Sequence, residues 1–315
     1  MILVTGGLGF LGCSIAYYLA KQGRKVLLTR HKTSRIPVFL EALLGTSVWI
    51  TPCDILDFSN LWFVLETHPI ESIIHAAGTA GQKGYLYQAL ITNVLGTMNV
   101  LEASRIKKIG RVTFTSSQSV YARGEKNHEE PEDLPLKSLH TISLTKKVGD
   151  LICDYYAREY GMEVIITRPC QLYGPLYSSE RNPLQKMVGN AVAGKTTDLA
   201  EVAPNDGNNM MYVKDCARAL ALIHLKERPQ FLIYNIADKY FTYREMAKAV
   251  KKVVPTTEIQ LGPERADVPG RMFLNMDRLK NEFGFAPEYD LDSGIRVWVN
   301  WLRDGQFSDT DWKQG

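Results

Sequence analysis

Three glycines near the beginning of the chain recur at every third position, and their spacing indicates a chemical task. Gly6, Gly9 and Gly12 follow the apolar run Ile2–Val4 and precede an apolar segment at 13–20. Glycines let a backbone approach phosphates closely, and a helix that begins there presents free N–H groups and a positive dipole to them. A tight turn with glycines for packing only is the alternative. The order of strand, glycine turn and helix favours a pyrophosphate site for a dinucleotide.

Positive side chains follow the next apolar run, 26–29, where dinucleotide-binding folds usually place an acidic residue. The sequence from 29 to 32 reads T-R-H-K, and Arg35 comes shortly afterwards. A carboxylate at this position would receive the ribose hydroxyls, whereas an arginine suits a ribose 2′-phosphate. A solvated basic loop is the alternative interpretation. We expect NADP rather than NAD as the cofactor, with Arg30 as its main contact here.

The composition is that of an ordinary globular protein of 315 residues, with a net charge of +3. Such a small charge gives no reason to expect nucleic acid or a membrane surface as a partner. No apolar run is long enough to span a bilayer. Five scattered cysteines without a C-x-x-C pair predict reduced thiols in a cytoplasmic protein and no metal site. Because the first expected strand begins almost at Met1, we expect no signal or transit peptide.

Strands and helices alternate over the first 170 residues and predict an α/β fold with a doubly wound parallel sheet. After the two strands above, further strands are expected at 48–50, 72–76, 111–115 and 162–167, with helices at 58–66, 85–105 and 144–160. Asp57 and Thr242 are expected to cap helices. Later segments are a helix at 183–193, a polar loop at 194–209, a short strand at 234–237 and helices at 242–253, 277–283 and 291–304.

Several side chains near the expected strand ends are candidate cofactor contacts. Asp54 follows the third strand and is placed to accept from the adenine amino group. The small residues at 76–78 allow a cofactor to lie against the backbone. Asn93 falls on a long buried helix and needs polar partners. His75 is interpreted as a packed or hydrogen-bonded histidine rather than a catalyst.

Eight motifs occur in order along the chain and cover it nearly from end to end. They are T-G-G-L-G-F-L-G (5–12), C-D-I-L-D (53–57), H-A-A-G (75–78), N-V-L-G-T (93–97), S-S-Q-S-V-Y (116–121), R-P-C-Q-L-Y-G-P (168–175), Y-V-K-D-C-A-R-A (212–219) and F-G-F-A-P (283–287). Their series resembles the extended short-chain dehydrogenase/reductase family, the NAD(P)-dependent epimerase/dehydratase group that acts largely on nucleotide sugars.

The resemblance implies a Rossmann domain over 1–175 and about 211–236, and a smaller α/β substrate domain over about 176–210 and 237–315. It also implies a set of cofactor contacts spread over the strand ends of the first domain. These are Gly6, Gly9, Phe10, Leu11, Gly12, Arg30, Asp54, Ile55, Ala76, Ala77, Gly78, Asn93, Lys146, Pro169 and Leu172.

In that family a Ser or Thr, a Tyr and a Lys transfer protons, the Tyr being the acid or base and the Lys lowering its pKa. Ser117 and Lys146 match two of these positions, and we expect both to be catalytic. The tyrosine position, four residues before the lysine, is Ile142. Isoleucine cannot exchange a proton, so the resemblance implies a non-standard acid or base. His140 is one candidate, because its pKa suits the task; Tyr85, Tyr87, Cys170 and Tyr173 are others.

Other departures bear on the reaction and the substrate. Sugar 4,6-dehydratases carry an Asp-Glu pair where this chain has Gln118 and Ser119, which disfavours a dehydratase. Gln171 replaces an Asn that is frequent in sugar-nucleotide members, so it is a candidate substrate contact. Arg265 and Arg271 are candidates to clamp a substrate diphosphate or carboxylate, with surface arginines as the alternative.

The sequence therefore predicts an NADP-dependent epimerase or reductase for a small sugar-nucleotide or related hydroxyl or carbonyl substrate. Two alternatives stay open: a repurposed enzyme of non-redox chemistry, such as a lyase, isomerase or cyclase, and a non-catalytic NADP-binding protein. The family resemblance also implies a homodimer in which the helices at 85–105 and 144–160 pair as a four-helix bundle. The alternative is that their apolar stripes pack within one chain.

Overall fold

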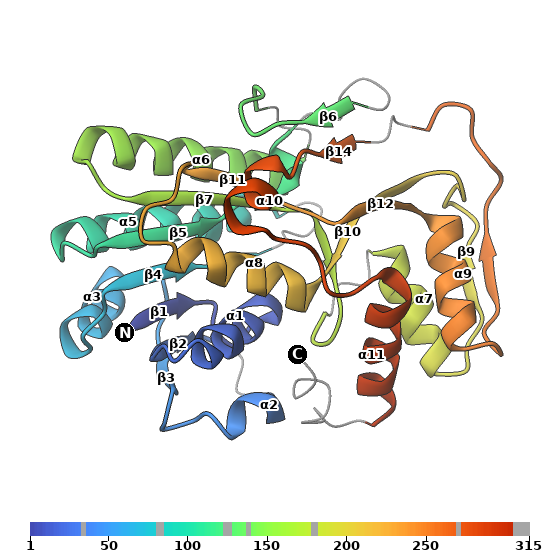
Figure 1. The fold of residues 1–315 in the computed structure, drawn as a ribbon, viewed down its shortest axis with the longest axis horizontal. Helices are drawn as coiled ribbons and strands as arrows, with labels where there is room; N and C mark the ends of the chain where they lie inside the picture. The colour runs from blue at the N-terminus through green and yellow to red at the C-terminus, as the bar shows by residue number, and fades with distance from the viewer. Residues whose placement is uncertain are drawn as a thin grey trace.

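The computed structural model describes residues 1–32, 36–79, 85–121, 128–136, 140–177, 182–268 and 272–304 (Figure 1). Its centre is a sheet of seven parallel strands, which confirms the predicted α/β fold of the Rossmann type. In spatial order the strands are β11 (Ile233–Ile236), β7 (Val164–Pro169), β5 (Arg111–Thr115), β4 (Ser72–His75), β1 (Ile2–Thr5), β2 (Val26–Arg30) and β3 (Val48–Pro52).

Helices cover both faces of this sheet because its buried strands are apolar on both sides. Ile2 and Val4 of β1 belong to one core, together with the helices α1 (Phe10–Lys21), α2 (Val38–Glu41), α8 (Val213–Leu225) and α10 (Asp277–Phe283). Leu3 points the opposite way, into the core formed with α3 (Phe58–Thr67), α5 (Gly96–Ile106) and α6 (Thr141–Tyr160). The two sets of helices lie on opposite sides of the sheet in Figure 1.

The rest of the chain forms smaller sheets beside the carboxyl ends of the central strands. One has the order β12 (Lys239–Thr242), β10 (Gly207–Tyr212) and β8 (Gln171–Tyr173). Two parallel pairs are β13 (Ile259–Leu261) with β9 (Thr197–Leu199), and β14 (Met272–Leu274) with β6 (His128–Glu130). The helices α7 (Pro183–Val192), α9 (Tyr243–Val253) and α11 (Leu291–Arg303) enclose a third core around the buried Trp298.

Two of the local expectations were wrong. The segment 194–209 is not a continuous polar loop, because β9 and the beginning of β10 lie within it. The segment 85–105 is not one α-helix: α4 (Leu86–Leu90) and α5 are separated by the π-helical turn η1 (Ile91–Leu95). Such turns insert a residue into a helix and often occur at functional sites. Asn93 lies within η1.

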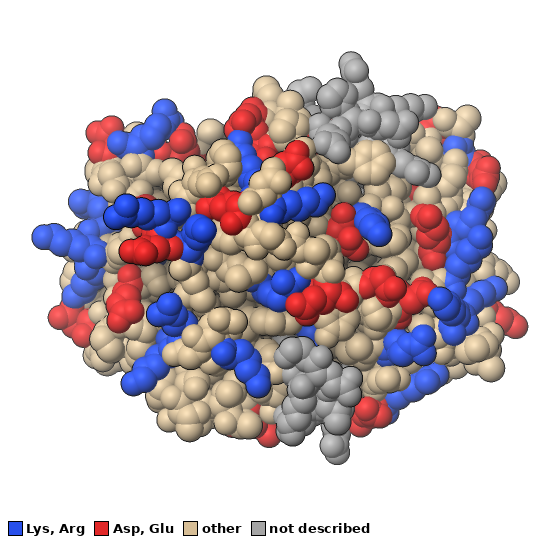
Figure 2. Space-filling view, in the orientation of Figure 1, with Lys and Arg blue, Asp and Glu red and all other residues tan. Residues whose placement is uncertain are grey.

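Several local expectations are confirmed. Asp57 caps α3 by accepting from the N–H of Asn60. Thr242 and Glu245 form the predicted capping box of α9. Within the described part of the chain, no helix is long and apolar enough to cross a membrane. On the face shown in Figure 2, positive and negative side chains are interspersed, in keeping with the small net charge.

Candidate active site

The glycine turn between β1 and α1 is built so tightly that side chains would not fit. Gly6 has a φ of +66°, and a Cβ added there would lie 2.7 Å from the Cα of Ala77. A Cβ on Gly12 would lie 2.3 Å from the carbonyl oxygen of Gly6. The turn is tied to β2, because the Gly6 N–H donates to Thr29 Oγ1 over 3.0 Å. These glycines bring the backbone of the turn close to the ends of the neighbouring strands.

The N-terminus of α1 suits an anionic group. Its N-cap is Gly9, so no side chain caps the first turn, and that turn contains no acidic residue. Uncapped N–H groups and the helix dipole both favour phosphate oxygens. The geometry of the turn and the chemistry of these donors fit the pyrophosphate of a dinucleotide.

A cavity of about 560 Å³, here called the outer cavity, opens over this turn. It is bounded by predicted cofactor residues from three strand ends: Gly6, Gly9, Phe10, Leu11, Gly12, Arg30, Ala76, Ala77 and Gly78. His31, Lys32 and Tyr177 also line it. Among the described lining residues there is no carboxylate, so the edge at the end of β2 is positively charged.

A second cavity of about 520 Å³, here called the inner cavity, adjoins the outer one. Phe10, Ala76, Gly78 and Tyr177 line both. Other lining residues include Ser117, Gln118, His140, Ile142, Lys146, Pro169, Cys170, Gln171, Leu172 and Asn208. The structure thus brings the predicted catalytic pair Ser117 and Lys146 to a cavity that is continuous with the candidate dinucleotide site.

Lys146 is half-buried, and no carboxylate of the described residues forms an ion pair with it. Its Nζ donates to the carbonyl oxygen of Thr115 over 2.6 Å and lies 4.9 Å from the centre of the Phe114 ring. Burial lowers its pKa from 10.5 to about 8, and the negative charge of Asp150 opposes this shift only partly. Asp150 is itself held by Arg168, with 2.9 Å between Nε and Oδ2. Lys146 is therefore an amine that can lose its proton near neutral pH.

Ser117 begins the 3₁₀ turn η2 (Gln118–Val120), and its hydroxyl is oriented by that turn. The Ser117 oxygen accepts from the N–H of Ser119 over 3.2 Å and from the hydroxyl of Ser119 over 3.0 Å. With two hydrogen bonds accepted, its own hydrogen is left to donate. This arrangement suits a residue that holds the oxygen of a substrate hydroxyl or carbonyl.

Ile142 lines the inner cavity one helical turn before Lys146, so an apolar side chain borders the cavity at the position where the sequence resemblance implies a phenol. The next residue, Ser143, offers no substitute, because it is buried and its hydroxyl accepts from the N–H of His140. His140 also lines the cavity, but its Nδ1 accepts from the Ser143 N–H over 3.3 Å and caps α6. Two tyrosines considered as substitutes lie elsewhere: Tyr85 is exposed, and Tyr173 is buried in the third core.

Asn93 has the polar partners that its burial requires. Its Oδ1 accepts from the Thr79 N–H over 2.8 Å, and its Nδ2 donates to Thr145 Oγ1 over 3.0 Å. A Cβ on Gly78 would lie 3.0 Å from Asn93 Oδ1. The π-helical turn thereby fixes the backbone at 78–79 beside both cavities.

His75 is structural, as expected from the sequence. Thr97 gives its only hydroxyl hydrogen to the Asn93 carbonyl over 2.6 Å, so His75 Nε2 must donate to Thr97 Oγ1. His75 Nδ1 then accepts from Thr5, 2.6 Å away. Burial, reinforced by the charge of Lys146, lowers its pKa from 6.5 to about 3. A histidine held neutral between two threonines is not available as a base.

A chain of side-chain amides borders the inner cavity and ends at a tyrosine that the sequence interpretation did not single out. Asn209 donates to Gln118 over 3.3 Å, and Gln118 donates to Asn208 over 2.9 Å. Asn208 donates to Gln171 over 3.3 Å, and Gln171 donates to the hydroxyl oxygen of Tyr177 over 3.0 Å. Tyr177 follows two residues after the G-P pair that ends the motif at 168–175, and this position of an aromatic residue was its only signal in the sequence.

The remaining predicted contacts are not brought to these cavities. Asp54 accepts from the Leu56 N–H and lies 3.5 Å from His31 Nε2, and neither it nor Ile55 is among the described lining residues. Arg265 is exposed and donates to the carbonyl oxygen of Glu201. Arg271 lies outside the described residues. The roles assigned to these residues stay predictions.

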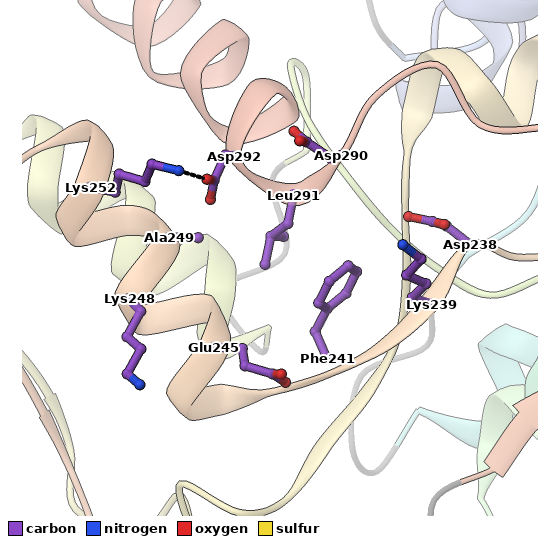
Figure 3. A pocket seen from close by; sticks show the side chains of 10 residues that line it. All are labelled: Asp238, Lys239, Phe241, Glu245, Lys248, Ala249, Lys252, Asp290, Leu291 and Asp292. Atoms are coloured by element: carbon purple, nitrogen blue, oxygen red, sulfur yellow. Dashed lines mark hydrogen bonds and ion pairs between the residues drawn. The ribbon is translucent and has the colours of Figure 1, made fainter.

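A separate cavity of about 390 Å³ lies between β12, α9 and α11 (Figure 3). Its floor is Phe241 and Leu291, and charged side chains surround it. Four of the seven charged residues are committed to the fold: Lys252 pairs with Asp292, Asp290 caps α11, and Glu245 belongs to the capping box of α9. Burial raises the pKa of Asp238 at its edge to about 6. This cavity shares no described lining residue with the other two.

Comparison with known proteins gives a consistent result. A model of the NAD dependent epimerase/dehydratase family matches residues 2–237. A putative UDP-glucose 4-epimerase of Methanocaldococcus jannaschii is 28% identical, over 96% of this chain and 98% of its own length. The mitochondrial L-threonine 3-dehydrogenase of Bos taurus is 27% identical, over 95% of this chain and 82% of its own.

Solved structures share the fold. The UDP-glucose 4-epimerase of Thermotoga maritima, crystallised with UDP-glucose, superposes with a TM-score of 0.83 at 21% identity, covering 96% of this chain and 99% of its own. The UDP-glucose 4-epimerase of Thermus thermophilus, in complex with NAD, has a TM-score of 0.83 at 23% identity, with 96% and 98% covered. The family model spans most of the chain and both sets of relatives extend over nearly all of it, so this chain belongs to the NAD dependent epimerase/dehydratase family.

Proposed function

We propose that the protein is an NADP-dependent epimerase or reductase that acts on a hydroxyl or carbonyl group of a sugar nucleotide or a related small molecule. The observation that carries this proposal is the placement of Ser117 and Lys146 on an inner cavity continuous with the glycine-lined outer cavity. The relatives named above as epimerases and dehydrogenases support the same class of reaction.

The preference for NADP rests on the end of β2. Arg30, His31 and Lys32 line the outer cavity where a ribose-binding carboxylate would otherwise stand. An arginine there can form charge-assisted hydrogen bonds to a 2′-phosphate. The solved relative from Thermus thermophilus holds NAD, so the choice of cofactor in this chain is a direct test of the role of Arg30.

The residues of the inner cavity have separate tasks in this proposal. A nicotinamide cofactor bound in the outer cavity would supply the acceptor, or in the reverse direction the donor, of a hydride exchanged with the substrate carbon. Ser117 donates its free hydrogen to the reacting oxygen, and Lys146 holds the nicotinamide ribose while its charge stabilises negative charge on that oxygen. Ile142 supplies an apolar wall and transfers no proton. Another group must therefore carry the proton.

The make-up of the inner cavity also bears on the type of reaction. Its described lining contains no carboxylate, and Gln118 and Ser119 stand where dehydratases of the family have acids. Water elimination in this cavity is therefore disfavoured. A non-redox reaction is the second candidate, and Ile142 is the observation that favours it, since the usual hydride chemistry loses its acid or base there.

A single-turnover experiment separates these candidates. Purified protein loaded with NADP⁺ or NADPH is mixed with a panel of UDP- and dTDP-hexoses, and nicotinamide absorbance is followed. We expect a transient or net absorbance change with at least one substrate. If a substrate is converted to product while nicotinamide absorbance stays constant throughout the first turnover, the non-redox candidate replaces the redox one.

We further propose a homodimer. Leu95 and Met98, on η1 and α5, and Leu151 and Tyr155, on α6, are large apolar side chains with 42–54% of their surface exposed. α5 and η1 both pack against α6, so the helices that carry these exposed side chains are neighbours. Such a region is typical of an interface, and a second copy could bury it by pairing the same helices. We retain a cytoplasmic location as a proposal because all five cysteines are free thiols.

A further inference from the structure

We propose that Tyr177 is the acid–base residue of the inner cavity and performs the proton transfer that Ile142 cannot. The inference rests on the proposed function for its substrate, but its physical basis is the position and hydrogen bonding of Tyr177. The group it would serve is the hydroxyl or carbonyl that reacts with the nicotinamide.

Tyr177 stands at the junction of the two cavities and lines both of them. Its ring meets that of Phe10 edge to face, with 5.0 Å between the ring centres. The turn that places it is strained: Leu176 has a φ of +69°, which is rare for a residue with a side chain. Residues held in sparsely populated conformations concentrate at functional sites because the surrounding fold must stabilise them.

The amide chain that ends at Tyr177 runs in one direction. Each amide from Asn209 through Gln118, Asn208 and Gln171 donates an N–H to the oxygen of the next. The last N–H, from Gln171, is given to the phenol oxygen. Hydrogen bonds in such a series polarise one another, so the final donor is strengthened. The N–H of Gln171 also fixes the orientation of the phenol group, because it occupies one lone pair of the Tyr177 oxygen.

The amide chain also decides what the phenol hydrogen can do. Because the oxygen of Tyr177 accepts from Gln171, its hydrogen is left for another acceptor. Among the described residues the Tyr177 hydroxyl donates to none, so the hydrogen is available to a substrate in the cavity. When a substrate alcohol is oxidised, a hydride leaves its carbon for NADP⁺ and its hydroxyl proton passes to the Tyr177 phenolate. Carbonyl reduction uses the same groups in reverse.

Other candidates on the inner cavity are already committed. Tyr121 donates to Asn235 over 2.8 Å and accepts from Arg168 over 2.7 Å, and burial raises its pKa to about 12. Burial also raises the pKa of the Cys170 thiol, which keeps it neutral. His140 uses Nδ1 to cap α6. Tyr177 is the phenol whose hydrogen bonds leave a proton available to a ligand in the described part of this cavity.

Two departures from the family pattern take part in this arrangement. Gln118 stands in a position that is acidic in dehydratases, and Gln171 replaces a frequent Asn. Both are links of the amide chain. The missing tyrosine on α6 and the amides that orient Tyr177 are thus explained together, as one relocated acid–base site.

The test uses a reaction that needs no substrate turnover. A small aryl sulfonyl fluoride reacts with a phenolate oxygen, which forms an O–S bond while fluoride leaves. Peptide mass spectrometry of the labelled protein then identifies the modified residue. We expect Tyr177 to be labelled first, NADP⁺ to protect it, and Gln171→Leu to slow its labelling by about fivefold, because one neutral hydrogen bond to the phenolate is lost. Tyr173→Phe, in the same segment but outside both cavities, should leave the rate unchanged.

A second arm tests catalysis in the protein with any substrate that it turns over. Tyr177→Phe keeps the ring on Phe10 and removes the hydroxyl, so kcat should fall by about 100-fold or more while NADP⁺ affinity changes less than about threefold.

The outcomes separate the two proposals. Labelling of Tyr177 that depends on Gln171, in a protein that transfers no hydride, supports the activated tyrosine and contradicts the redox function. Hydride transfer that survives in Tyr177→Phe overturns the catalytic role of Tyr177 and leaves the redox function standing. Labelling that favours other residues, or that ignores Gln171→Leu, overturns the inference about the amide chain.

Discussion

Ile142 and Lys146 lie one turn apart on α6 and border the same cavity, yet only Lys146 carries a group that can exchange a proton. In the family pattern the two positions act together, because the lysine lowers the pKa of a neighbouring phenol. Here the lysine keeps its place against the Thr115 carbonyl, and the phenol is absent. The site therefore retains the residues that would hold a cofactor and a substrate oxygen, and the proton must be transferred by a residue elsewhere in the lining of the cavity.

The first prediction concerns the cofactor. Arg30→Asp should weaken NADP⁺ binding by about 10- to 100-fold, because a charge-assisted hydrogen bond to the 2′-phosphate is replaced by repulsion. NAD⁺ should bind the variant at least as well as it binds the native protein. Isothermal titration calorimetry measures all four affinities. Arg296→Asp, an exposed position on α11, is the matched control. Native protein that binds NAD⁺ as tightly as NADP⁺ would refute the preference.

The second prediction restores the family arrangement on α6. Ile142→Tyr should leave the melting temperature nearly unchanged, because the side chain faces a cavity with room for a ring. The new phenol would stand one turn before Lys146, and reductase or epimerase turnover should rise by about tenfold or more. Ile142→Phe adds the ring without the hydroxyl and should give no increase. Equal turnover for the two variants would show that a tyrosine at 142 adds no proton transfer.

The third prediction concerns the pH dependence of stability. The pKa of Lys146 is about 8 in the folded protein and 10.5 as its ordinary value. Between these values the unfolded chain binds more protons, so this group makes stability rise with pH, by roughly 3 kcal/mol in all. Lys146→Met should lack this rise. The test is the free energy of unfolding of both proteins, measured with denaturant and without cofactor from pH 7 to 10.5. If it changes with pH in the same way in both proteins, the pKa of Lys146 is not lowered in the folded state.

The fourth prediction concerns assembly. Combining Met98→Asp with Leu151→Asp places charges in the exposed apolar region of α5 and α6. The homodimer should dissociate into monomers that stay folded, as measured by sedimentation equilibrium and circular dichroism. Phe63→Asp, on an exposed position of α3, is the control and should remain dimeric. A native protein that sediments as a monomer would remove the basis of this proposal.

Much of the fold could be predicted because its signals are local. The glycine turn at 6–12, the alternation of apolar strands with helices, and the capping box at Thr242 and Glu245 are each set by neighbouring residues. The need of Asn93 for partners was also evident from its burial on an apolar helix. The family pattern then placed Ser117 and Lys146, and the structure brings both to one cavity.

The remaining features depend on contacts between distant segments. The direction of the turn after Gly174 is fixed by packing against Phe10, so the position of Tyr177 could not be predicted from its neighbours. The amide chain joins residues 118, 171 and 208 through three different elements. β9 and β10 were missed because their polar residues carry little strand signal and pair with partners far along the chain.

The most direct test of the whole account is hydride transfer. Candidate nucleotide hexoses deuterated at the reacting carbon are mixed with native protein loaded with NADP⁺, the reaction is stopped by acid during the first turnover, and deuterium in the nicotinamide is measured by mass spectrometry. Stopping within one turnover is required because an epimerase returns the deuteride to the substrate carbon at the end of each cycle. We predict transfer by the native protein, reduced by about 100-fold or more in Ser117→Ala and in Lys146→Met. A protein that binds NADP⁺ and converts a substrate without moving deuterium to the nicotinamide would contradict the proposed redox function.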